Sequence, residues 1–472
     1  MRWYDLVTIN AYWFALTTRA QVLTPLIIPL LVQEFVGDAA KGRYVGVMRL
    51  WALMAAVLLQ ALMGMFSDRS TLRWGRRRPF IVVGTVGEWA VFILIGLTAS
   101  LDRMTGYWVL FGLYLLSMIS SNTAHAATQA LIPDLVPEDK RGLFSGVKVL
   151  FELPFPLIFV SFVVGRMVSA GSIWGALFSV MIIMLVCMLI TLLVREKPLT
   201  EPPAEPKWGS FLRLVLMTTV FTVIILGAGA AVKTAMHVLS ALPAHLSRAL
   251  VAVCAIFGMG GAAVAGVWVS IGIGIGPDIR RQPSFTWWVI NRLAFLVAAT
   301  NLAGFLLFFY QERFSDLSQE KAAGPAANAI MLVGVCVLLT ALPGGWLADR
   351  IGKKPLIASA GLLAAMGAYL VVILPSLAAT YVGACMVGAA TGLFYSANWA
   401  LGTELVPREQ AGRYLGVSNL AGAGAGAIGA YIGGPIADSF GYVFLFAIYG
   451  SLFLLSVLAL KGITLSGTAS SA

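Results

Sequence analysis

Apolar segments of about twenty residues recur along the whole chain, and this feature limits its possible folds more than any other. A helix needs about 20 apolar residues to cross the hydrocarbon core of a membrane. Backbone groups in lipid must be satisfied within the protein, so we expect helices, and the roughly ten-residue alternation of a β-barrel is absent. Only 11% of the 472 residues are charged, against about a quarter in a soluble domain. The sequence therefore predicts an all-α polytopic membrane protein.

The apolar segments form a group of six, a pair and a second group of six. The first six are expected near 7–32, 44–66, 79–99, 106–132, 143–167 and 172–194. The pair is expected near 211–236 and 246–276, and the last six near 284–310, 326–347, 355–374, 378–403, 411–435 and 440–460. We therefore predict 14 spans in four regions: a six-helix bundle (1–195), a proline-rich cytoplasmic linker (196–210), an inserted transmembrane hairpin (211–280) and a second six-helix bundle (281–472).

The distribution of Lys and Arg supports this arrangement. If the chain starts inside and the spans alternate, 21 of the 32 basic residues fall in cytoplasmic loops and 8 in outer loops. This bias agrees with the positive-inside rule, and it requires the middle pair to cross the membrane twice. We therefore expect cytoplasmic N- and C-termini. Topology also explains the net charge of +11, so we expect the lipid bilayer, and no nucleic acid, as a partner.

Two basic loops repeat along the chain. GMFSDRSTLRWGRRRPF follows the second span, and GGWLADRIGKKP follows the second span of the last six. Their aspartates, Asp68 and Asp349, are 281 positions apart. Residues 129–147 and 399–417 also match, at an offset of 270. Matched polar loops in the same order indicate a duplicated half, as transporter folds often have.

The pattern G-x-x-x-D-R-x-G-R/K-R/K at these two places is identified as the signature of the major facilitator superfamily, which the chain resembles over nearly its whole length. Within that superfamily, SDRSTLRWGRRRPFI (67–81) and NTAHAATQALIPDLVPEDKRG (122–142) resemble the glycoside-pentoside-hexuronide and sucrose-transporter-like symporters. The resemblance implies the major facilitator fold, alternating access and proton-coupled uptake of a sugar, glycoside or similar polar metabolite. We expect a multi-pass monomer without cofactors in the plasma membrane, which in a bacterium is the inner membrane.

Two features depart from those symporters. The segment between Arg49 and Asp68 has no acidic residue, and the middle hairpin lies outside their twelve-span plan. The hairpin resembles that of fourteen-span drug exporters, so a proton-coupled efflux antiporter for amphipathic compounds is one alternative. A non-transporting assembly factor or receptor on the same fold is another. The four cysteines lie singly in apolar runs and no reactive motif is visible, so we expect neither a metal site nor an enzyme with catalytic residues.

The repeated loops are expected to gate the protein. Glycines permit tight turns, and acidic residues at the ends of the fourth spans can pair with the basic clusters. Such ion pairs would hold the two halves closed on the inside; alternatively, the arginines act only as a topology signal. The expected gating residues are Gly64, Asp68, Arg69, Gly75, Arg76, Arg77, Asp134, Arg141, Gly345, Asp349, Arg350, Gly352, Lys353, Glu404 and Arg413.

Polar side chains within the spans are the candidates for substrate binding, because an ionisable group at mid-membrane costs about 2.5–3.5 kcal/mol. Arg19 can bind a carboxylate or hydroxyl, or form a buried structural ion pair; Arg292 can bind ligand or snorkel to the surface. Polar residues on one face of the fourth span match a polar and aromatic face in the second half, which suits a polyhydroxylated substrate, although a lone histidine can also be a packing residue. The predicted substrate-binding set is Arg19, Gln21, Asn122, His125, Gln129, Asn291, Arg292, Tyr395, Asn398 and Trp399.

Two carboxyl groups within spans are candidates for proton coupling. Glu88 lies near the middle of the third span, and Glu152 lies in LFELPFP of the fifth. Loss of hydration disfavours an ionised carboxylate, so either group could exchange a proton near neutral pH, and structural hydrogen bonding is the alternative.

Overall fold

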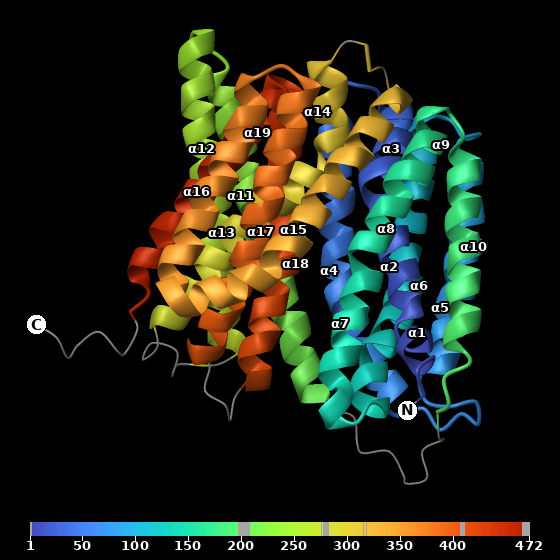
Figure 1. Cartoon of the computed structure of the whole chain (residues 1–472). Coiled ribbons are helices and arrows are strands. Elements are labelled where there is room, and N and C mark those ends of the chain that lie inside the picture. The colour runs from blue at the N-terminus through green and yellow to red at the C-terminus, as the bar shows by residue number, and fades with distance from the viewer. Residues whose placement is uncertain are drawn as a thin grey trace, which may run out of the picture. The chain divides into compact units, whose positions relative to one another are not determined.

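The structure is a computed structural model that describes residues 2–196, 208–274, 276, 283–314, 316–317, 319–405 and 411–464, without the side chains of 403, 411–419 and 421. The described residues form helices joined by short turns, with no β-strand (Figure 1). This confirms the predicted all-α class. Most of the predicted linker, 197–207, and the end of the predicted hairpin, 277–280, lie outside the described residues.

The first six predicted spans correspond to ten α-helices, because two of the spans are interrupted. These helices are α1 (Asp5–Thr8), α2 (Ala11–Val22), α3 (Ile28–Val36), α4 (Lys41–Asp68), α5 (Arg78–Thr98), α6 (Arg103–Leu135), α7 (Arg141–Glu152), α8 (Pro154–Phe159), α9 (Gly165–Ser169) and α10 (Ile173–Thr191). A π-helical turn at Leu23–Ile27 joins α2 to α3, and another at Val160–Val164 joins α8 to α9.

The remaining spans follow in order. They are formed by α11 (Trp208–Leu239), α12 (Ala244–Gly274), α13 (Pro283–Gly304), α14 (Leu306–Arg313), α15 (Ala323–Ile351), α16 (Lys353–Ile373), α17 (Leu377–Leu405), α18 (Ala411–Phe440) and α19 (Tyr442–Ala459).

By length and composition, twelve helical segments in the described part of the chain could cross a membrane, and the bent pair α13 and α14 brings the number to thirteen. The helix α18, whose first nine side chains are not described, covers the predicted span near 411–435. The described residues therefore contain twelve candidate spans, and the total of fourteen stays a prediction.

The span predicted near 284–310 corresponds to two helices, α13 and α14, which meet at an angle of 57°. Phe305, between them, has the non-helical dihedral angles φ −110° and ψ 7°. The neighbouring Gly304 faces the Arg49 guanidinium so closely that a Cβ atom would collide with it. The absence of a side chain at Gly304 therefore leaves room for Arg49 at the bend.

The chain divides into two compact units. Unit 1 comprises Met1–Asp38, Ala55–Leu212 and Ser315–Gly334, and unit 2 comprises Ala39–Met54, Arg213–Phe314 and Val335–Ala472. In unit 1, α5 packs on α6, and α10 packs on α2 and α5; a Cβ at Gly84 would lie 2.6 Å from the Ser120 carbonyl oxygen, so this glycine permits the close approach of α5 and α6.

In unit 2, α13 packs on α18 and α19, and α16 packs on α17 and α19. The second helix of the inserted hairpin, α12, packs on α18 and α13 of the same unit. Figure 1 shows α11 and α12 in green beside the yellow-to-red helices of the second half. The hairpin therefore has a packing partner within unit 2.

Candidate functional site

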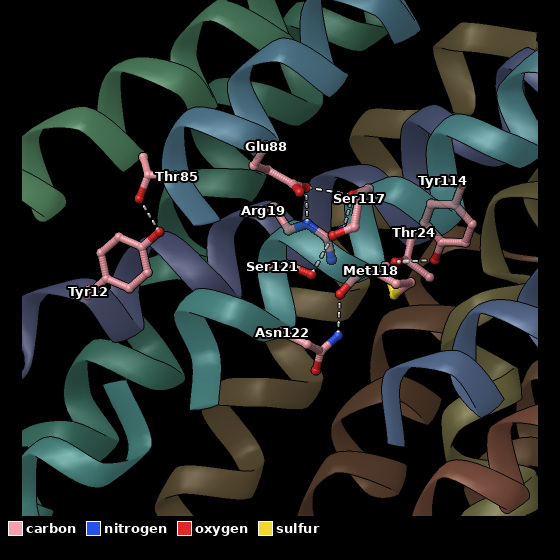
Figure 2. A network of polar contacts seen from close by, with 10 residues as sticks. All are labelled: Tyr12, Arg19, Thr24, Thr85, Glu88, Tyr114, Ser117, Met118, Ser121 and Asn122. Carbon is pink, nitrogen blue, oxygen red and sulfur yellow. Dashed lines mark hydrogen bonds and ion pairs between the residues drawn. The ribbon is translucent and has the colours of Figure 1, made fainter. Parts of the chain in front are cut away.

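A buried ionic network in unit 1 joins three helices (Figure 2). Arg19 on α2 donates from Nε to Glu88 Oε1 on α5 at 2.6 Å, and its Nη2 donates to Ser117 Oγ on α6. Ser117 Oγ in turn donates to the same Glu88 oxygen at 2.6 Å. The side chains of Arg19 and Glu88 are 6% and 0% exposed. Two residues predicted for different roles are therefore in direct contact.

One atom of this network has no partner. Glu88 Oε2 is buried and accepts no hydrogen bond from the described residues. A buried acceptor without a partner is costly, and a proton on that oxygen would remove the cost of the negative charge. The arrangement can therefore hold or release a proton beside a fixed guanidinium.

The other substrate candidates of unit 1 lie along α2 and α6. Asn122 Nδ2 donates to the Met118 carbonyl one turn earlier at 2.8 Å, as Figure 2 shows. The His125 ring packs edge-on against Trp13, 5.3 Å between centroids. Gln129 Oε1 accepts from Gln60 at 3.0 Å, and the half-buried Gln21 makes no side-chain hydrogen bond to a described residue.

The second coupling candidate, Glu152, has a different environment from Glu88. Its side chain is 36% exposed, and its carboxylate pairs with Lys148 one turn earlier on α7, at 3.3 Å. The Lys148 ammonium also lies 3.7 Å from the centroid of the Trp13 ring. Glu152 is therefore paired and partly exposed, whereas Glu88 is paired and fully buried.

A second polar cluster, in unit 2, contains all the substrate candidates of the second half. Arg292 on α13 is 9% exposed, and its guanidinium carbon lies 5.9 Å from the Tyr395 ring centroid and 5.2 Å from that of Trp399. Its Nη1 donates to Asn398 Oδ1 at 3.3 Å. Asn398 Nδ2 donates to Asn291 Oδ1 at 2.9 Å. The residues on α13 and α17 thus form one connected group.

Asn291 and Arg292 of this cluster differ in how many of their hydrogen-bonding groups already have a partner. Asn291 Nδ2 donates to the Ser456 carbonyl on α19, and Asn291 Oδ1 accepts from Asn398. Both ends of this side chain therefore form hydrogen bonds between helices. Arg292 Nε, by contrast, is buried without a hydrogen-bond partner among the described residues. Tyr395 and Trp399 are each 40% exposed. A guanidinium beside two partly exposed rings can bind a ligand hydroxyl or carboxylate.

The first basic loop is closed by ion pairs within unit 1. Arg77 Nη2 lies 2.5 Å from Asp68 Oδ1 and 2.7 Å from Asp134 Oδ2, and Arg76 also pairs with Asp134. Gly75 has φ +116°, a conformation that favours glycine. Arg69 Nη1 donates to the Met65 carbonyl at 3.0 Å.

Arg141 lies beside this loop at the start of α7. Its Nε and Nη2 donate to the carbonyls of Val136 and Pro133, both at 3.1 Å. These carbonyls belong to the end of α6, where backbone acceptors lack helical partners. Arg141 therefore caps α6 rather than joining the ion pairs of Asp134.

In the described part of the second basic loop, Lys353 forms an ion pair with Glu404 within unit 2. Gly352 has φ +91°, and the exposed Arg350 stacks on Trp346 at 4.1 Å; Asp349 is also exposed. The Arg413 side chain lies outside the described residues.

Glycine positions divide into two kinds. Gly75 and Gly352 form turns, but Gly64 and Gly345 lie inside α4 and α15.

Each ion pair above joins residues of the same unit, so a latch between the halves stays a prediction.

Three contributors to these sites were missed from the sequence. Ser117 links Arg19 to Glu88. It lies on α6 one turn before Ser121 and next to the predicted polar face, so its spacing in the sequence could have identified it as part of the site. Ser67 Oγ accepts from Arg77 Nη1 at 2.8 Å, and Glu196 Oε2 accepts from the Arg77 amide at 2.8 Å. Glu196 is 119 residues from Arg77, and no sequence signal joins them.

Two family models match the chain. The model described as "MFS/sugar transport protein" matches residues 39–251, and the model described as "Major Facilitator Superfamily" matches residues 293–468. The sucrose transport protein SUT1 of Oryza sativa subsp. japonica is 31% identical over 99 residues, 17% of this chain and 18% of the relative. The minor myo-inositol transporter IolF of Bacillus subtilis (strain 168) is 30% identical over 126 residues, 27% of each chain. The aligned parts thus span well under a third of either relative.

Solved structures resemble the whole chain. The xylose transporter XylE from E. coli has a TM-score of 0.59 at 15% identity, over 97% of this chain and 98% of that one. A POT family transporter in complex with 5-aminolevulinic acid has a TM-score of 0.65 at 14% identity, over 96% and 94%. These likenesses confirm the expected fold, and the family consists of transporters rather than enzymes. With both repeated loops and both halves matched, the chain belongs to the major facilitator superfamily.

Proposed function

We propose that this protein is a proton-coupled symporter that takes up a sugar, a glycoside or a similar polar metabolite by alternating access. The relatives SUT1 and IolF are transporters of sucrose and of myo-inositol, which supports a polyhydroxylated substrate. The buried Arg19, Glu88 and Ser117 network, with its unpartnered carboxylate oxygen, is the observation that most supports coupling to protons.

In this proposal the two polar clusters have separate tasks. Glu88 exchanges the proton, and Arg19 holds the carboxylate in place through a charge-assisted hydrogen bond. Arg292 binds the substrate oxygens through its guanidinium, while Tyr395 and Trp399 offer aromatic faces to the sugar ring. Glu152 is the second candidate for the proton site.

The predicted arrangement in the membrane belongs to the same proposal. We place fourteen spans and both termini in the cytoplasm, with bundles at 1–195 and 281–472, the linker at 196–210 and the hairpin at 211–280. The protein acts as a monomer in the plasma membrane. The ion pairs of the basic loops close its cytoplasmic side.

Transport by the purified protein in liposomes tests the function. Counterflow against a panel of sugars, glycosides and polyols identifies the substrate, and uptake with an imposed pH gradient tests coupling. We expect saturable exchange of at least one polyhydroxylated compound and its accumulation when the outside is acidic. Failure to exchange any of them, together with gradient-driven export of amphipathic compounds, would overturn the proposal in favour of an efflux antiporter. Failure to move either class would favour a non-transporting role.

A further inference from the structure

A cavity of about 710 Å³ lies in unit 2 where the inserted hairpin turns. Its wall is formed by the end of α11, the start of α12, the start of α4 and the end of α18. Four basic side chains line it, namely Arg43, Lys233, His237 and Arg248. Neither of the polar clusters described above contributes to this cavity, so it is a separate site.

Among the described residues, Asp438 is the only one that brings a carboxylate to the cavity wall, and both of its oxygens accept hydrogen bonds. Asp438 Oδ1 accepts from the Gly42 amide at 2.8 Å, and Oδ2 accepts from the Arg43 amide at 2.7 Å. These amides belong to the first turn of α4, where backbone N–H groups lack helical partners. Asp438 therefore caps α4 with both oxygens.

Two of the cations, Lys233 and Arg248, have no carboxylate partner among the described residues. Among the described residues, no carboxylate oxygen lies within 4 Å of the nitrogens of Lys233, His237 or Arg248. The Lys233 ammonium lies 5.0 Å from the Tyr431 ring, and Arg43 lies over Tyr44. With His237 neutral, three cations and one carboxylate give the wall a charge of +2. A concave wall with this charge attracts a compact anion.

The position of the cavity favours the phosphate of a lipid over a soluble anion. Both α11 and α12 are long and apolar enough to cross a membrane, so their joined ends are expected at the level of the head groups. Apolar side chains complete the wall, among them Met236, Leu242 and Phe440. Val238, in the last turn of α11, is 65% exposed. Basic pockets between membrane helices are the type of site that binds phospholipid head groups.

We infer that this cavity binds the phosphate head group of an anionic phospholipid and thereby anchors the inserted hairpin to α4 and α18. The lipid phosphate accepts hydrogen bonds from Arg43, Lys233 and Arg248, and the acyl chains lie along the apolar surface of the hairpin. This role is independent of the transported substrate. Lipid binding would thus be a role of the inserted hairpin that is separate from the role of the other twelve predicted spans.

Native mass spectrometry of the full-length protein tests this inference. The detergent-purified protein is titrated with phosphatidylglycerol, with phosphatidylethanolamine of the same acyl chains, and with glycerol phosphate as the soluble head group. We expect phosphatidylglycerol to bind at least tenfold more tightly than either of the other two. Each basic residue near an anionic head group contributes about fivefold, so K233Q/R248Q should bind phosphatidylglycerol about 30-fold more weakly.

The control R213Q/K461Q removes the same charge from exposed residues of the same unit that do not line the cavity, and we expect binding within twofold of the wild type. If K233Q/R248Q does not give a monodisperse protein, the single exposed substitution R248Q should still lose about fivefold. Equal binding of the two lipids, or equal losses in both double variants, would overturn the site. Glycerol phosphate binding as tightly as phosphatidylglycerol would overturn the assignment to a lipid.

Discussion

The Glu88 carboxylate is held on one side only: Oε1 accepts two hydrogen bonds, and Oε2 accepts none from the described residues. We expect Glu88→Gln to reduce the accumulation of substrate driven by a pH gradient at least tenfold. Counterflow by the same variant should stay measurable. An amide cannot carry the coupled proton, whereas exchange at equal pH does not need it. The variant should also be less stable by about 3–5 kcal/mol, because Arg19 keeps an uncompensated buried charge.

A double variant separates coupling from stability. Replacing Arg19 and Glu88 together by Met removes both buried charges, so the unfolding temperature should rise relative to Glu88→Gln. Accumulation should remain absent. If the double variant recovers accumulation as well as stability, the pair is only structural and the proton site lies elsewhere, with Glu152 as the next residue to test.

Arg292 offers a test of the substrate cluster. Its planar guanidinium lies near two rings and bonds Asn398, a geometry that a lysine ammonium cannot reproduce. We expect Arg292→Lys to raise the half-saturation concentration for uptake about tenfold while the protein level stays unchanged. Arg166→Lys, at an exposed arginine 5.5 Å from Phe162, is the matched control and should leave uptake unaltered. Equal half-saturation concentrations in wild type and Arg292→Lys would remove Arg292 from the site.

Sequence reasoning selected Arg19 and Glu88 but not their contact. Both were chosen because a charge within an apolar span is costly, and that cost can be read from one helix at a time. Their pairing depends on how α2, α5 and α6 rotate about their axes, with 69 residues between the partners. The same reason explains why Asn291 was predicted to bind substrate although its amide bonds Ser456 and Asn398.

Elements were predicted more completely than their interruptions. Each described helix lies within a few residues of an expected apolar segment, since burial in lipid sets its length. The bend between α13 and α14 was not predicted, because it involves a contact between Gly304 and Arg49 from another helix. Gly75 and Gly352 could be assigned to turns because each follows a helix and precedes basic residues.

The start of α4 is stabilised by a residue from a different helix, which allows a prediction about the element as a whole. Asp438 of α18 accepts from two free amides of α4, so Asp438→Ala should lower stability by about 1 kcal/mol, the usual value of a helix cap. Thermal unfolding of the purified protein measures this loss. Ser439→Ala, at the adjacent exposed residue, should unfold at the wild-type temperature. If the two variants unfold at the same temperature, the hydrogen bonds of Asp438 to α4 do not contribute to stability.

At the scale of the whole molecule, the predicted arrangement depends on the hairpin crossing the membrane twice. Only then do the repeated loops after α4 and α15 lie on the same side. Single cysteines in a variant without Cys187, Cys254, Cys336 and Cys385 can test this in intact cells. Thr71→Cys, in the first basic loop, should react with an impermeant thiol reagent only after the cells are opened. Ala241→Cys, in the turn between α11 and α12, should react at once.

A cysteine in the second basic loop decides between fourteen spans and thirteen or twelve. Ile351→Cys, at the exposed end of α15, should be protected in intact cells, as Thr71→Cys is, because two crossings by the hairpin restore the starting side. A hairpin that crossed only once would expose Ile351→Cys while Thr71→Cys stayed protected. A hairpin lying on the cytoplasmic surface would protect all three positions. Labelling of Ala241→Cys alone is thus the one pattern in which both halves keep their basic loop in the cytoplasm and the hairpin presents its basic cavity to the outer leaflet.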